Sequence, residues 1–217
     1  GALEVLREAG YLARPASREL LVRDPDNNAE FFFLRPRDIA TYVGSGQLDV
    51  GITGRDLLLD SASEGRAAEV MSLGFGASTF HYATTPGQAA DVQGLAGLRI
   101  ATSYQGLVEE HLASLGVEAT VVKLDGAVEN AIRLGVADAV ADVVSTGTTL
   151  RAAGLEIVGE PILRSEAVLV RRQGAPADPA VEHLVRRLNG VLVARDYVMM
   201  DYDIRVEQVD SAIALTP

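Results

Sequence analysis

Short segments typical of strands and of amphipathic helices alternate along most of the chain, and this alternation constrains the fold more than any other feature. Leu48–Thr53 predicts a strand that leads through Gly54 into a helix, and Arg99–Thr102 begins a second run of strands and helices. A rhythm of this kind is typical of an α/β fold with mostly parallel sheets covered by helices.

Two breaks interrupt the alternation, at Pro86-Gly87-Gln88 and at Pro161. The block between them has a complete α/β pattern of its own. We therefore predict a two-lobed α/β fold in which a second lobe, 85–165, is inserted into a first lobe formed by 1–84 and 166–217. The cleft between two such lobes is where we expect a ligand.

Four further segments carry specific expectations. Phe31, Phe32 and Phe33 in succession favour a strand covered on both faces. We expect helices at 127–134 and 205–213 and a last strand at 198–203.

Composition excludes several classes of function. Of 217 residues, 48% are hydrophobic, which is enough for a full core. The 19 Lys and Arg against 30 Asp and Glu give a net charge of −11, so the chain repels nucleic acid. It has no cysteine, which excludes disulfides and thiolate metal sites. Its three histidines are scattered, and it has no serine elbow, Walker lysine or Gly-x-Gly-x-x-Gly motif.

A phosphate site is predicted where the segment Leu134–Leu150, LGVADAVADVVSTGTTL, changes from strand to helix. Unpaired N–H groups at a helix start, hydroxyls and the helix dipole together suit an anion. Asp138 and Asp142 are four residues apart on the strand, so both project from one face. Threonine and serine are also ordinary N-cap residues, so the segment alone leaves a plain strand-to-helix turn open.

A second strand-turn-helix segment, Gly51-Ile52-Thr53-Gly54-Arg55-Asp56, has a glycine on each side of its turn. It is either a plain tight turn or a place where Arg55 and backbone amides meet a phosphate or nucleotide. Arg35 and Arg37 flank Pro36 and offer two more guanidiniums, which suit bidentate phosphate binding. Glycines in Leu73–Ser78, LGFGAS, predict a bend between the lobes.

Four stretches together resemble one family. RPRDIATYVGSGQLDVGITGRDLL, LGFGAS, KLDGAVENAIRLGVADAVADVVSTGTTL and GEPILRSEAVLVRR occur in the order found in ATP phosphoribosyltransferases, the first enzyme of histidine biosynthesis. The resemblance covers nearly the whole chain and implies a two-lobed fold like type II periplasmic binding proteins. It also implies a reaction in which N1 of ATP displaces pyrophosphate from C1 of 5-phosphoribosyl 1-pyrophosphate (PRPP), with Mg²⁺ as cofactor.

The resemblance also implies site residues. The PRPP site would consist of Glu129, Asp142, Ser145, Thr146, Gly147, Thr148 and Thr149. The nucleotide side would consist of Arg35, Arg55, Asp56 and Ser78. No side-chain nucleophile is implied, because displacement at an anomeric carbon depends on positioning and on stabilising charge.

Several expectations follow for the molecule as a whole. The stretches YVMMDYD and GITGRDLL are similar to long-form members, so we expect a catalytic core without the family's regulatory domain. The family's basic Pro-x-Lys-Gly loop is not among these residues, which leads us to expect low activity from them alone. We also expect a cytoplasmic homodimer or hexamer, inhibition by AMP and histidine, and neither nucleic-acid nor membrane partners.

Two other interpretations share parts of the pattern. A two-lobed binding or effector-sensing module without catalysis would have the same fold, although it has little use for a threonine-rich anion site after an acidic strand. The segment ADVVSTGTTL is also similar to the PRPP loop of type I phosphoribosyltransferases. Those carry two adjacent acids before the turn, whereas Asp138 and Asp142 are separated here.

Overall fold

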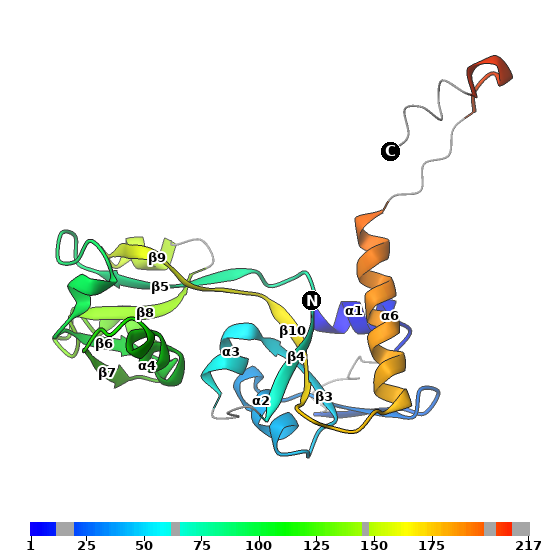
Figure 1. Cartoon of the computed structure of the whole chain (residues 1–217), viewed down its shortest axis with the longest axis horizontal. Coiled ribbons are helices and arrows are strands. Elements are labelled where there is room, and N and C mark those ends of the chain that lie inside the picture. The colour runs from blue at the N-terminus through cyan, green and yellow to red at the C-terminus, as the bar shows by residue number, and fades with distance from the viewer. Residues whose placement is uncertain (12–19, 62–65, 145–147, 198–202, 210–217) are drawn as a thin grey trace.

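The fold of this chain, a computed structural model, is built on two β-sheets joined by two crossings of the backbone (Figure 1). The structure describes residues 1–11, 20–61, 66–144, 148–197 and 203–209. In this part of the chain, no helix is long and apolar enough to cross a bilayer.

The first sheet has three strands in the order β3-β10-β4, and β10 is antiparallel to both neighbours. Its strands are β3 (Val50–Gly54), β10 (Ala167–Arg172) and β4 (Ala67–Ser72). Around it lie α1 (Ala2–Glu8), the hairpin β1 (Leu21–Asp24) and β2 (Ala29–Phe32), α2 (Pro36–Gly44), α3 (Arg55–Asp60) and α6 (Pro179–Asp196). Its two cores centre on Leu169 and on Val170, which are adjacent in β10 and face opposite sides.

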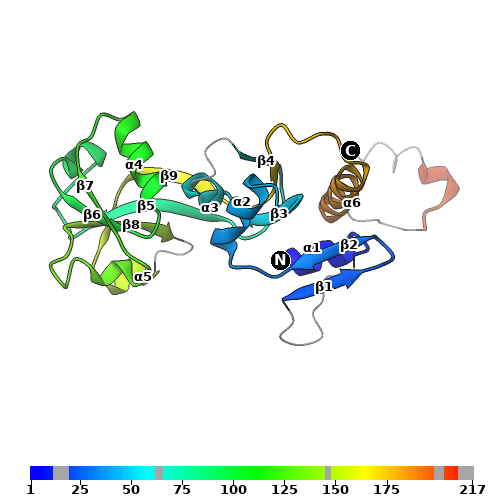
Figure 2. The ribbon, with the colours of Figure 1, turned by 90° about the horizontal axis from the view of Figure 1, so that it is seen from below.

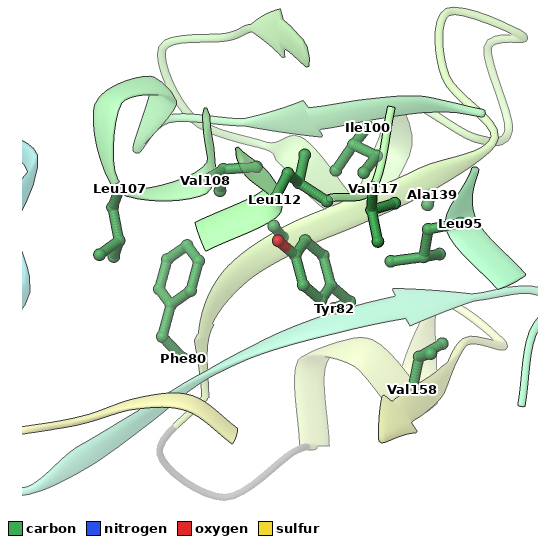
Figure 3. Close-up of a cluster of buried hydrophobic side chains, with 11 residues drawn as sticks. Phe80, Tyr82, Leu95, Ile100, Leu107, Val108, Leu112, Val117, Ala139 and Val158 are labelled. Atoms are coloured by element: carbon green, nitrogen blue, oxygen red, sulfur yellow. The ribbon is translucent and has the colours of Figure 1, made fainter. Parts of the chain in front are cut away.

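The second sheet has five strands in the order β7-β6-β8-β5-β9. They are β7 (Thr120–Lys123), β6 (Arg99–Thr102), β8 (Ala139–Val144), β5 (Ser78–Thr84) and β9 (Glu156–Ser165). Helix α4 (Gln105–Ser114) lies on one side of this sheet and α5 (Thr148–Ala152) on the other (Figure 2). The core beneath α4 holds Phe80 and Tyr82, both without exposed surface, with Leu107, Val108 and Leu112 from the helix (Figure 3). This close-packed core makes the five-stranded sheet rigid.

The three-stranded sheet is antiparallel and the five-stranded sheet is mixed, so the expectation of mostly parallel pairing is wrong in part. Strands β7, β6 and β8 are parallel, but β5 is antiparallel to β8 and to β9. The chain enters the five-stranded sheet through β5 and leaves it through β9, so these two strands run in opposite directions.

The predicted lobe boundaries, 1–84 with 166–217 and 85–165, stay a prediction, but one element differs from them. Strand β5, expected in lobe I, pairs with β8 and β9 of the five-stranded sheet. The chain passes between the sheets at 73–77 and again at 166. The break at Pro86 therefore follows a strand that has already entered the second sheet.

Four smaller expectations are also corrected or untested. Phe32 is 46% exposed, because β1 and β2 form a separate hairpin with one open face. Instead of a helix at 127–134, a short 3-10 turn, η2, spans Val128–Asn130, and another 3-10 turn, η3 (Val206–Gln208), lies in the predicted last helix. Most of the strand expected at 198–203 lies outside the described residues.

Candidate functional site

The two sheets approach each other where α3 meets the start of α4, and Tyr104 lies at this contact. The charge of Asp56, which lies in the first turn of α3, acts on its hydroxyl. The guanidinium carbon of Arg37 lies 4.8 Å from the centre of its ring, and Phe80 packs against the ring edge-on at 5.0 Å. Burial, reinforced by the charge of Asp56, raises the pKa of Tyr104, so its hydroxyl stays a donor at neutral pH.

Asp56 is held in place by a serine from the other sheet. It is 7% exposed, and its Oδ1 accepts a hydrogen bond of 2.7 Å from Ser165 Oγ. The backbone N–H of Asp56 donates to Ser165 Oγ at 3.0 Å. A Cβ on Gly54 would lie 2.3 Å from this carboxylate, and one on Gly51 would lie 2.3 Å from Ile39. Both glycines of the turn are therefore required by close packing.

Asp60 makes a second contact between the sheets, at the other end of α3. Its Oδ2 lies 2.5 Å from Nη1 of Arg37, and its Oδ1 accepts the backbone N–H of Leu107 at 3.2 Å. Helix α4 has no side-chain cap of its own, so a carboxylate from the other side of the molecule takes that role. A cavity of about 430 Å³ lies beside this contact, lined by Leu59, Asp60, Ser61, Gln105, Gly106, Glu109, Glu110 and Lys123.

On the five-stranded sheet, Asp142 lies near the end of β8 and is half-buried. Burial raises the pKa of this carboxyl, and the nearby charge of Glu129, in η2, raises it further. One oxygen of Asp142 accepts the N–H of Val143 at 2.7 Å. In the pairing of β8 with β5, Asp142 lies opposite His81, so the two side chains project from the same face of the sheet.

The predicted phosphate segment is only partly described. Ser145, Thr146 and Gly147 lie outside the described residues. Thr148 and Thr149 open α5, which runs to Ala152, but their side chains are not described. The strand-to-helix transition expected from the sequence is therefore present around these positions.

Asp138 does not share the position of Asp142, although both were expected to face one ligand. It precedes β8 and is bound by Arg99, with oxygen–nitrogen distances of 3.0 Å to Nε and 2.8 Å to Nη2. It also accepts the backbone N–H of Arg99 at 3.0 Å. The two acids lie four residues apart along the strand, about 13 Å, so Asp138 stabilises the opposite end of β8.

The other predicted nucleotide residues lie in different surroundings. Arg55 donates to both carboxylate oxygens of Glu69 at 2.8 Å, to Ser72 Oγ at 2.8 Å and to the carbonyl of Arg164 at 3.3 Å. Arg35 is exposed at the start of α2 and forms no ion pair with the described residues. Ser78 begins β5 and pairs with Ser165, the residue that holds Asp56.

Sequence reasoning missed Tyr104, Asp60 and Ser165. Each is a single polar residue at the end of an element, and only the meeting of the two sheets gives it a partner. The one available signal was the position of Tyr104 directly after a predicted strand, where ligand-contacting residues often lie.

Comparisons with known proteins show the family of this chain. A family model described as HisG, ATP phosphoribosyltransferase, matches residues 35–190. The ATP phosphoribosyltransferase of Streptomyces avermitilis is 60% identical over 220 residues, covering 100% of this chain and 76% of the relative. That of Kocuria rhizophila is 63% identical over 216 residues, with 100% and 76% covered.

Solved structures are similar as well. The ATP phosphoribosyl transferase (HisG:HisZ) complex from Thermotoga maritima has a TM-score of 0.76 at 25% identity, covering 89% of this chain and 92% of that one. A periplasmic binding protein from Brucella ovis, at 15% identity and TM-score 0.51 over 90% and 72%, shares the fold alone. These likenesses confirm the two-lobed fold, and relatives named as enzymes disfavour a non-catalytic binding module. The chain therefore belongs to the ATP phosphoribosyltransferase family, enzymes of histidine biosynthesis that use ATP and PRPP as substrates.

Proposed function

We propose that ATP and PRPP meet between the two sheets, with PRPP on the end of β8 and the nucleotide on the starts of α2 and α3. The observation that carries this proposal is the half-buried carboxylate of Asp142 near the end of β8, whose pKa is raised by burial and by the nearby charge of Glu129. A carboxyl whose pKa is raised by burial is typical of a functional site.

PRPP would bind with its ribose diol against Asp142 and Glu129. A diol can donate two hydrogen bonds, which would satisfy the Asp142 carboxyl, whose pKa is raised by burial and by the nearby charge of Glu129. The 5′-phosphate would then sit on Ser145, Thr146, Gly147, Thr148 and Thr149, where the N-terminus of α5 favours an anion.

The nucleotide would lie against the opposite side. Arg35 is exposed and forms no ion pair with the described residues, so it can take a phosphate of ATP. Asp56 and Ser78 border the same contact, through Ser165. Arg55 would act mainly from behind, because most of its N–H groups are already bound to Glu69, Ser72 and Arg164.

N1 of ATP would displace pyrophosphate from C1 of PRPP, forming a C–N bond while the C–O bond breaks. The protein contributes positioning and a stable charge environment, because no side chain has to act as nucleophile. Mg²⁺ would arrive with PRPP as part of the substrate and offset the charge of the leaving pyrophosphate. Among the described residues, no three acidic or histidine side chains gather as a metal site, which favours this origin.

We further propose that the protein is cytoplasmic, forms a homodimer or hexamer, and is inhibited by AMP and histidine. The ATP phosphoribosyl transferase (HisG:HisZ) from Thermotoga maritima is itself a complex, which supports assembly in this family. Size-exclusion chromatography with light scattering would test the assembly state.

The decisive test is absorbance detection of N1-(5-phosphoribosyl)-ATP from ATP, PRPP and Mg²⁺. We expect Asp142→Asn to weaken PRPP binding at least tenfold, about 1.4 kcal/mol, by calorimetry. Asp138→Asn is the matched control, the same change at the opposite end of the strand, and it should leave PRPP affinity within twofold. Equal affinity in both variants would refute the site. Thr146→Val with Thr149→Val should weaken PRPP binding to a similar degree.

A further inference from the structure

A buried histidine lies beside the proposed PRPP strand without an obvious structural reason. His81 is in the middle of β5 and is 9% exposed. Among the described residues, its Nδ1 is buried without a hydrogen-bond partner. An apolar side chain would fill the same space without the cost of a buried unsatisfied nitrogen, so packing alone does not account for imidazole here.

The other nitrogen of His81 belongs to a short chain of hydrogen bonds. Nε2 lies 3.0 Å from Thr79 Oγ1, and the Thr79 hydroxyl donates to the carbonyl of Val144 at 3.1 Å. Because the hydroxyl hydrogen is used on Val144, Nε2 carries the imidazole hydrogen and Nδ1 is left as the acceptor. Burial, with the nearby charge of Arg164, lowers the pKa of His81, which keeps this neutral form at physiological pH.

The chain of hydrogen bonds ends where the proposed PRPP segment begins. Val144 is the last residue of β8, and in the antiparallel register Thr79 lies opposite Val144 and His81 opposite Asp142. On its other side, β9 shifts register between Phe80 and Tyr82, so His81 has no partner there. An irregularity of this kind re-aims side chains and is common beside active sites.

We propose that His81 and Thr79 are positioning residues for PRPP, holding the end of β8 through the Val144 carbonyl so that Asp142 meets the ribose of PRPP. Neither side chain has to touch the substrate. This inference rests on the proposed function, because it assumes that PRPP binds at the end of β8.

The test measures the affinity of the chain for PRPP with Mg²⁺, by calorimetry, in Thr79→Val. We expect about a fivefold loss, about 1 kcal/mol, with ATP affinity changed less than twofold. Thr79→Ser keeps the hydroxyl and should restore PRPP affinity to within twofold. His81→Phe fills the same space without ring nitrogens and should reproduce the loss, which provides a second variant if Thr79→Val does not fold.

Thr84→Val is the matched control. Thr84 is in the same strand, is 1% exposed and donates to a backbone carbonyl at 3.1 Å, but it lies opposite Ala139 at the far end of β8. It should lower the melting temperature as Thr79→Val does and leave PRPP affinity unchanged. Equal effects of the two valine variants on PRPP affinity, or no rescue by serine, would overturn the positioning role.

Asp142→Asn, measured in the same experiment, separates failure of the positioning role from failure of the proposed PRPP site. If Asp142→Asn weakens PRPP binding and Thr79→Val does not, only the positioning role is refuted. If Asp142→Asn has no effect, the proposed PRPP site fails and this inference fails with it.

Discussion

Replacing Arg55 with methionine tests whether this residue holds the two crossings of the chain together. Its guanidinium pairs with Glu69 through Nε and Nη2, each at 2.8 Å, and Nη2 also lies 3.4 Å from Glu166 in the second crossing. Glu166 in turn accepts the N–H of Gly74 in the first crossing at 3.1 Å. One side chain thus connects both segments that join the sheets.

The burial of these groups sets the size of the effect. The Arg55 side chain is 22% exposed, Glu69 31% and Glu166 27%. Exposed pairs contribute roughly 0.2–1 kcal/mol, and breaking a fully buried pair costs roughly 3–5 kcal/mol. Mostly buried groups with two-point contact lie between these limits, so we expect Arg55→Met to cost about 2 kcal/mol. For a chain of this size, that lowers the melting temperature by roughly 4–8 °C.

Urea unfolding followed by circular dichroism would measure the loss, because methionine keeps the apolar stem of Arg55 while removing its charge. Arg23→Met is the matched control: Arg23 is 76% exposed and pairs with Glu30 at 2.8 Å, so its loss should stay below about 0.5 kcal/mol. Equal losses in the two variants would refute the hinge role. A fall in ATP affinity without a loss of stability would instead support Arg55 as a nucleotide contact.

Three further changes have defined outcomes. Asp60→Ala removes the cap of α4 and the partner of Arg37, and should cost about 1–2 kcal/mol in urea unfolding, with faster amide exchange at the start of α4. Asp142→Asn should raise the melting temperature at neutral pH while weakening PRPP binding, because folding disfavours this carboxylate, whose pKa is raised. Arg99 lowers the pKa of Asp138 to about 2, so the stabilisation is complete above pH 3.8 and is lost as the pH falls through 2. Carboxyl titration by NMR should show this pKa, and Arg99→Gln should return it toward 3.8.

Local patterns in the sequence predicted the elements well. The strand expected at Leu48–Thr53 is β3, Val50–Gly54, and the glycines of LGFGAS form the expected bend, with φ of +67° at Gly74 and +70° at Gly76. Side-chain periodicity and glycine conformation depend on neighbours in sequence, so they can be read without a structure.

Pairing between distant segments could not be read in this way. Strand β10 lies between β3 and β4, more than a hundred residues after β3, and nothing in its own sequence indicates that it is antiparallel to both. Arg55 shows the same limit within the candidate site. Its position after a glycine turn predicted a nucleotide contact. In the structure it pairs instead with Glu69, in β4, and with Glu166, between β9 and β10.

Two contacts between the two sides of the molecule, at Asp60 and at Arg55, share one property. Asp60 reaches across to a neutral backbone N–H of Leu107 while its ion pair with Arg37 stays on its own side. Arg55 likewise reaches the neutral carbonyl of Arg164, and its main ion pair, with Glu69, stays within the three-stranded side. Separating the two sides at such a contact costs roughly 1.5–3 kcal/mol, compared with roughly 3–5 kcal/mol for a buried charge left unpaired. Because Asp60 and Arg55 keep their ion pairs in both states, these two contacts can separate without stranding an ion, whereas Asp56 would lose its hydrogen bond with Ser165.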